Sequence, residues 1–104
     1  MRKPKHKEKE KVLTGVGWYR PEQWQRLLEI SVDVDQLEKT HAEWLAFAEK
    51  TVKDLERLGV SIIKVDVDVE ELQIWSRQQG LPIDGKARAQ FISNKAQQVG
   101  KTLG

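Results

Sequence analysis

Residues 60–67 read V-S-I-I-K-V-D-V, and this stretch decides the fold class. β-Branched residues fill five of its eight positions, which is typical of a strand. Side chains alternate across a strand, so the stretch has a mostly apolar face and a half-polar face; the apolar face holds Ser61, Ile63, Val65 and Val67. This pattern predicts one strand of a sheet that is covered on one side.

A single strand needs a hydrogen-bonding partner, because an unpaired edge promotes association with other chains. Residues 12–18, V-L-T-G-V-G-W, are the best second strand in the chain, although Gly15 and Gly17 interrupt them. Two arrangements remain open at this point. The stretch pairs with residues 60–67 inside the chain, or residues 60–67 pair with their copy in a second subunit.

Four helices are predicted around this sheet. The first runs from Pro21 to about residue 30, and the second runs from a capping box at Asp33 to about residue 58, ahead of Gly59. Its apolar stripe includes Leu37, His41, Trp44, Ala48, Val52, Leu55 and Leu58, widened by Leu45 and Phe47. The third helix starts at Asp68 and ends at Gly80, and the fourth covers residues 86–99 after an N-cap at Asp84.

These elements predict a mainly helical α+β fold, with about four helices on a minimal two-stranded sheet and one long central helix. The 104 residues suffice for one domain, expected over residues 12–104. Residues 1–11 hold six basic and two acidic side chains and no apolar residue after Met1, so they predict a disordered basic tail. The remaining residues carry 12 basic and 14 acidic groups, a net charge of −2.

Composition limits the chemistry. The chain has no cysteine, which excludes disulfides, thiolate metal sites and cysteine nucleophiles. No apolar run approaches the length of a membrane span, and the first residues lack a signal peptide, so a cytoplasmic protein without membrane contact is expected. We predict no cofactor, no metal and no catalytic residue.

The acidic and histidine motifs have structural explanations. The segments Asp33–Asp35 and Asp66–Glu71 lack the spacing of a calcium loop, and both lie where helices are expected to begin, so capping explains them. Glu38-x-x-His41 occurs once, whereas a di-iron site needs two such pairs. His41 is therefore interpreted as a hydrogen-bonded, partly buried side chain.

The four tryptophans are the most unusual feature of the composition. Trp24, Trp44 and Trp75 each lie on the apolar stripe of a different helix and are interpreted as core residues. Trp18 precedes the first helix together with Tyr19 and Arg20. These three residues are the candidate partner-binding anchor.

The last helix carries Lys86, Arg88 and Lys95 among several amide side chains. They form a candidate nucleic-acid face in the alternative interpretation, in which the basic tail also binds phosphates. The proline-stiffened turn before this helix and the acidic Glu70 and Glu71 argue against a DNA-recognition helix. A solvent-exposed helix face is the preferred interpretation, and nucleic acid is not expected as a partner.

The motifs also resemble those of a family of small uncharacterised bacterial proteins, a domain of unknown function. The resemblance spans residues 17 to about 95 and rests on W-Y-R with E-Q-W at residues 18–24, V-D-V-E at residues 67–70, Trp75, and G-L-P at residues 80–82. It implies a bacterial, stand-alone protein and carries over no catalytic residue.

The sequence thus favours a non-catalytic bacterial interaction protein that forms a homodimer, with an unknown protein partner as a further option. The alternative is a nucleic-acid-associated protein, and an enzyme of unrecognised type is the third hypothesis.

Overall fold

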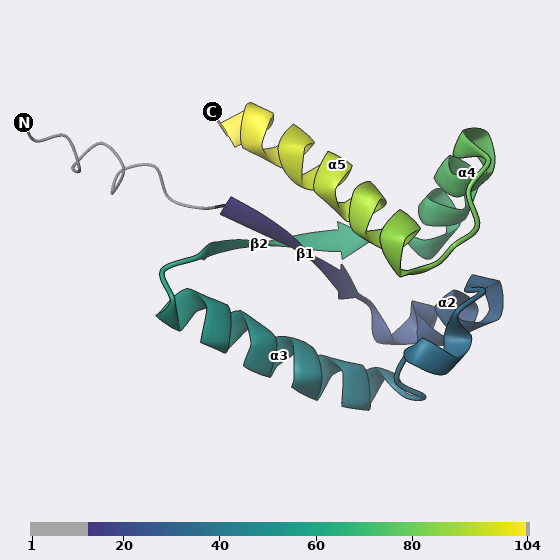
Figure 1. Cartoon of the computed structure of the whole chain (residues 1–104), viewed down its shortest axis with the longest axis horizontal. Coiled ribbons are helices and arrows are strands. Elements are labelled where there is room, and N and C mark those ends of the chain that lie inside the picture. The colour runs from purple at the N-terminus through teal and green to yellow at the C-terminus, as the bar shows by residue number, and fades with distance from the viewer. Residues whose placement is uncertain (1–12, 104) are drawn as a thin grey trace, which may run out of the picture.

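The computed structural model describes residues 13–103, so the predicted tail at residues 1–11 lies outside the described residues. The elements, in chain order, are β1 (Leu13–Tyr19), the 3₁₀ turn η1 (Pro21–Gln23), α2 (Trp24–Ile30), the 3₁₀ turn η2 (Val34–Gln36), α3 (His41–Arg57), β2 (Ser61–Val67), α4 (Val69–Gln79) and α5 (Gly85–Leu103). The fold is α+β and mainly helical, with four helices on a two-stranded sheet (Figure 1), which confirms the predicted fold class.

The sheet pairs β1 with β2 in parallel, from Leu13 opposite Ser61 to Tyr19 opposite Val67. The internal pairing that the sequence left open is therefore present. Parallel strands need a long crossover connection, and residues 20–60, with α2 and α3, supply it.

Helices cover both faces of this sheet. Figure 1 shows α5 on one face and α3 on the other. Val65 and Val67 are buried on the α5 face, as the alternation of residues 60–67 predicts. Lys64 and Asp66 point to the other face and remain exposed, because α3 covers that face incompletely.

Two glycines in β1 allow α5 to lie close to the sheet. A Cβ atom at Gly15 would lie 2.6 Å from the Cβ of Ala96, and one at Gly17 would lie 2.4 Å from the Cδ1 of Ile92. Both distances are too short for real atoms. The interruption of the strand pattern at Gly15 is therefore a requirement of helix packing, whereas at Gly17 the close atom is the end of the flexible Ile92 side chain, which can move.

Gly15→Ala is expected to lower the free energy of unfolding by about 1–3 kcal/mol, because the Ala96 Cβ cannot move without a shift of the α5 backbone. The second substitution Ala96→Gly should recover part of that loss by removing the clashing atom. Urea unfolding measures both variants. Gly85→Ala is the control, since its added Cβ meets atoms no closer than 3.8 Å; an equal loss in this control would contradict the explanation.

The prediction of a long second helix that starts near Asp33 is wrong. α3 begins at His41 rather than near Asp33, and Thr40 is its N-cap, with its Oγ1 accepting a hydrogen bond from the Glu43 backbone N–H at 3.1 Å. Asp33 precedes only η2 and makes no side-chain cap there. Phe47 and Leu58 are also exposed, at 60% and 79%, although the predicted stripe included them.

Two further helix ends differ from the prediction: α2 begins at Trp24, after the 3₁₀ turn at Pro21–Gln23, and α5 continues to Leu103 rather than ending at residue 99. The remaining helix ends agree with the sequence. Asp68 caps α4 by accepting hydrogen bonds from the Glu70 and Glu71 backbone N–H groups. Gly80 ends that helix in the left-handed conformation, at φ 68°. Asp84 Oδ1 accepts a hydrogen bond from the Ala87 N–H at the start of α5, and Gly59 follows α3 at φ 90°.

Candidate interaction surface

The outer edge of β1 borders an apolar groove. Within the described part of the chain, β1 hydrogen-bonds only to β2, so its other edge is unpaired. A groove of about 560 Å³ lies between this edge and α5. We call it the β1–α5 groove; it is lined by Thr14, Gly15 and Val16 of β1 and by Ala89, Ile92, Ser93, Ala96 and Gln97 of α5.

No side chain that lines the β1–α5 groove is charged, although 33% of the residues in the chain are. The two strand edges also differ. β2 carries the exposed Lys64 and Asp66, and charged side chains of this kind discourage pairing at an edge. β1 carries no charged residue, so its edge lacks this protection.

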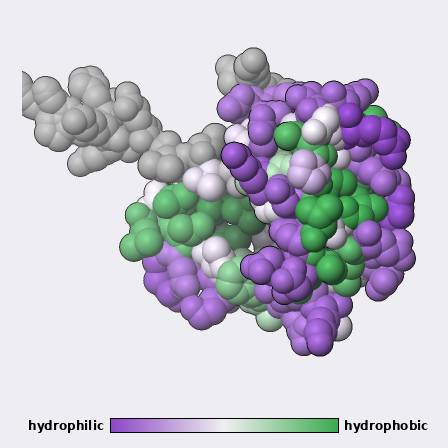
Figure 2. Space-filling model, turned by 45° about the vertical axis from the view of Figure 1, so that its right-hand side comes forward, coloured by the Kyte–Doolittle hydropathy of each residue, from purple (hydrophilic) through white to green (hydrophobic). Residues whose placement is uncertain are grey.

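Outside the groove, the exposed apolar side chains belong to several separate elements. Large apolar side chains reach solvent from several elements, namely Val32, Val34, Phe47, Leu58, Ile74 and Leu81. Figure 2 shows separate apolar areas on one face of the molecule, with hydrophilic side chains between them. The β1–α5 groove therefore stands out because it combines apolar lining with an unpaired strand edge.

The candidate anchor of Trp18, Tyr19 and Arg20 belongs to the folded interior and its rim. Tyr19 is only 9% exposed, so its side chain offers a partner little surface, and burial raises the pKa of its phenol to about 12. Trp18 is partly buried and packs edge-on against Trp44, with ring centroids 5.3 Å apart. These rings fill the core, so they leave little area for a partner.

Arg20, which directly follows β1, is held by an acidic residue of β2. Its guanidinium donates two hydrogen bonds to Asp66, from Nε at 3.1 Å and from Nη2 at 3.2 Å. Asp68 lies 3.9 Å from the same Nη2. Since parallel strands end at the same side of the sheet, this contact ties the carboxyl ends of β1 and β2 together.

The core predictions for the other aromatic residues are mostly confirmed. Trp24 and Trp44 are buried, at 4% and 8% exposure, and their rings stack with centroids 5.6 Å apart. Trp75 is only half-buried and lies edge-on to Phe91 at 5.5 Å. His41 is half-buried and its Nε2 donates to the Tyr19 carbonyl oxygen at 2.7 Å, as its interpretation from the sequence required.

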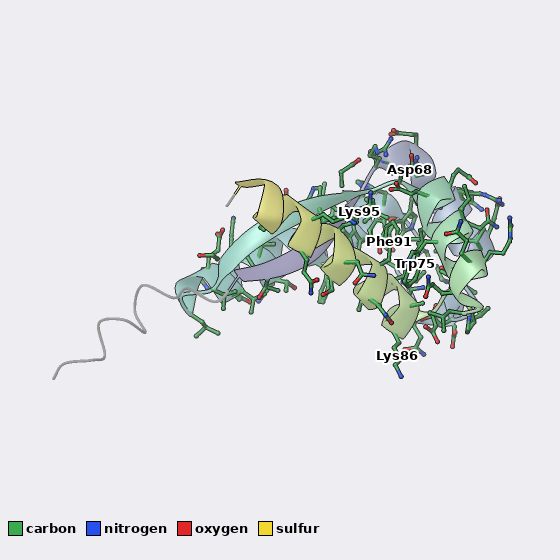
Figure 3. All side chains as sticks on the ribbon, turned by 90° about the horizontal axis from the view of Figure 1, so that it is seen from above. Asp68, Trp75, Lys86, Phe91 and Lys95 are labelled. Atoms are coloured by element: carbon green, nitrogen blue, oxygen red, sulfur yellow. The ribbon has the colours of Figure 1, made fainter. Side chains whose placement is uncertain are left out.

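The predicted basic face of Lys86, Arg88 and Lys95 does not form. Arg88 is 7% exposed and donates two hydrogen bonds to Asp33, at 2.9 and 2.8 Å, and a third to Ser31 Oγ at 3.1 Å. Lys95 pairs with Glu71 at 2.7 Å, while Lys86 is exposed near the start of α5, apart from Lys95 (Figure 3). The prediction that Arg88 lies on an exposed helix face is wrong, because helical periodicity does not reveal a buried ion pair.

Asp33 therefore joins two distant segments. Its carboxylate also accepts a hydrogen bond from the Gly85 backbone N–H at 3.0 Å, so it helps to cap α5 rather than a helix of its own. Hydrogen bonds from Arg88 hold the pKa of Asp33 below its usual value. This contact fixes the start of α5, and with it the flank of the helix that lines the β1–α5 groove.

A second groove, of about 310 Å³, separates α4 from α5. We call it the α4–α5 groove; Trp75, Phe91 and Lys95 line it (Figure 3), together with Glu71, which forms an ion pair with Lys95. Sequence reasoning found neither groove, because both depend on where α5 lies against other elements. The only local signal for the first one is the uncharged run at residues 12–18.

The acidic side chains of the Asp66–Glu71 segment are engaged within the fold. Besides the contacts of Asp66, Asp68 and Glu71 already described, Glu70 pairs with Arg26 at 3.1 Å. Across residues 13–103, no group of three or more His, Cys, Asp or Glu side chains is placed to hold a metal ion. In that same range, no helix combines the length and apolar character needed to cross a membrane.

Comparison of the chain with protein-family models, curated proteins and solved structures finds no match. The class of protein is therefore described from its fold and its groove. Over residues 13–103 it is a small α+β protein with a two-stranded parallel sheet, whose β1 edge is unpaired and carries no charged side chain.

Proposed function

We propose that this chain is a non-catalytic interaction protein that forms a homodimer through the edge of β1. The observation that carries the proposal is the sheet itself. Parallel sheets are normally wider and fully enclosed, whereas this one has only two strands in the described residues. A partner strand at the β1 edge would satisfy the backbone groups that β1 leaves unpaired there.

The charged residues support a structural role rather than a catalytic one. Arg20, Arg26, Arg88 and Lys95 each bind a carboxylate of another element, and these contacts hold the elements together. Arg88 in particular forms a buried ion pair with Asp33, so its guanidinium is not open to a partner. The nucleic-acid alternative, which uses the basic tail and the face of Lys86, Arg88 and Lys95, therefore loses Arg88, and no observation within residues 13–103 favours it over self-association.

The full-length chain is expected to sediment as a dimer of about 24 kDa, twice the monomer mass of 12.0 kDa, at tens of micromolar. Dilution should reveal the monomer, as for any reversible association. Sedimentation equilibrium over a range of concentrations measures this. A mass of 12 kDa at every concentration would contradict the proposed function.

A matched pair of lysine variants locates the dimer interface. Thr14→Lys places a charge on β1, and Ser61→Lys places one on β2; both positions are half-buried near the start of their strands. In the proposed dimer, only the first brings like charges together, so only Thr14→Lys should raise the dimer Kd, by about tenfold or more. The reverse order of effects would assign the interface to β2.

A further inference from the structure

The geometry points to a specific arrangement of this dimer, which rests on the proposed function: the β1–α5 groove of one protomer meets the same groove of a second copy. The two β1 strands pair antiparallel across a two-fold axis, and the two α5 helices pack against each other on one face of the joined sheet. Three features of the groove support this arrangement.

The first feature is the strand edge. A two-fold axis perpendicular to the sheet, beside β1, makes identical strands antiparallel and keeps the same face of each sheet on the same side. The result is a four-stranded sheet in the order β2, β1, partner β1, partner β2. Helix α5 packs against β1 and β2 in each protomer, so this operation places the two α5 helices side by side.

The second feature is the flank of α5 that borders the edge. Ala89, Ser93 and Ala96 are spaced four and three residues apart, so they form one stripe along the helix, and all three line the groove. Gly15 lets Ala96 pack closely on β1, while Ala89 and Ser93 are exposed and form the part of the stripe that a second helix can reach. Helix axes approach to about 8 Å only where side chains are this small.

The third feature is charge. An interface related by a two-fold axis faces its own copy, so each charged group near the axis would meet an identical charge. The eight residues of the β1–α5 groove carry no charge, and the groove therefore suits a second copy of itself. The α4–α5 groove differs, because the charged residues Lys95 and Glu71 line it.

The test uses single-cysteine variants, since the natural chain has no cysteine. Ser93 and Asn94 are neighbouring exposed residues of α5, but Ser93 lines the β1–α5 groove and Asn94 lines the α4–α5 groove. Each full-length variant, Ser93→Cys and Asn94→Cys, is treated with a short bismaleimide at a concentration where the chain is dimeric. Ser93→Cys should form covalent dimer at least about tenfold faster than Asn94→Cys.

The outcomes separate this inference from the function on which it rests. If sedimentation shows a dimer but Asn94→Cys reacts as fast or faster, or neither variant forms covalent dimer, the arrangement is overturned and self-association stands. If the chain is monomeric at every concentration, the arrangement and the proposed homodimer are both contradicted. Circular dichroism of each variant must match the parent chain, and Thr14→Lys combined with Ser93→Cys should lose the rapid cross-linking.

Discussion

Trp44→Ala is expected to lower the free energy of unfolding by about 3–5 kcal/mol. The ring is 8% exposed and lies where β1, α2 and α3 meet. It packs edge-on against Trp18 and Tyr19, stacks on Trp24 and contacts His41, with centroid distances of 5.2 to 5.6 Å. Truncation removes apolar contact with four other rings and leaves a cavity that such rigid neighbours fill poorly.

Phe47→Ala is the matched control for this substitution. Phe47 lies on the same helix, three residues further along, but its side chain is 60% exposed. Its truncation should change the free energy of unfolding by less than about 0.5 kcal/mol. Urea unfolding at one protein concentration compares the two; a loss of less than about 1 kcal/mol for Trp44→Ala would show that the ring does not support the core.

Arg88→Met should also lower the free energy of unfolding, by about 2–4 kcal/mol, because it leaves the partly buried Asp33 carboxylate without its cation. The Arg88 side chain is 9% exposed and that of Asp33 is 22% exposed, so water screens the pair only in part. The substitution also frees Ser31 Oγ and loosens the loop that holds the start of α5. Lys86→Met, at an exposed position two residues earlier, should change stability by less than about 0.5 kcal/mol.

The pH dependence identifies the cause of this loss. The folded-state pKa of Asp33 is lowered by Arg88, so the ionised carboxylate stabilises the fold at pH values above its unfolded pKa of about 4. That contribution is lost as the pH falls through the lower, folded-state pKa. The difference between the natural chain and Arg88→Met should therefore narrow below about pH 4. A difference that stays constant down to pH 2 would mean that packing, rather than charge, explains the loss.

Local features of the structure could be predicted from the sequence alone. Alternation in residues 60–67 identified β2 and its buried face, and Asp68, Gly80 and Asp84 marked helix ends. The burial of Trp24 and Trp44 followed from helical spacing. Each of these depends on residues within one or two turns of the chain, where backbone geometry links spacing directly to direction.

The start of α3 shows where local reasoning failed. Asp33 followed by Gln36 has the form of a capping box, and Leu37 continues the apolar spacing. Yet the carboxylate of Asp33 binds Arg88, 55 residues away, and the backbone N–H of Val32 donates to the Ile83 carbonyl oxygen. Bonds to a distant segment outweighed the weak local preference for a helix at these residues.

The sequence by itself determined the fold class, the internal strand pair as one of two options, most helix ends and two of the three helical tryptophans as core. Tertiary structure alone decided that Arg88 is buried, that Tyr19 and Trp18 belong to the interior, and that an uncharged groove borders β1. The physical reason is the sequence separation over which each kind of interaction acts. Propensity, capping and periodicity act over a few residues, whereas ion pairing, ring packing and the approach of α5 to Gly15 join residues more than 20 positions apart.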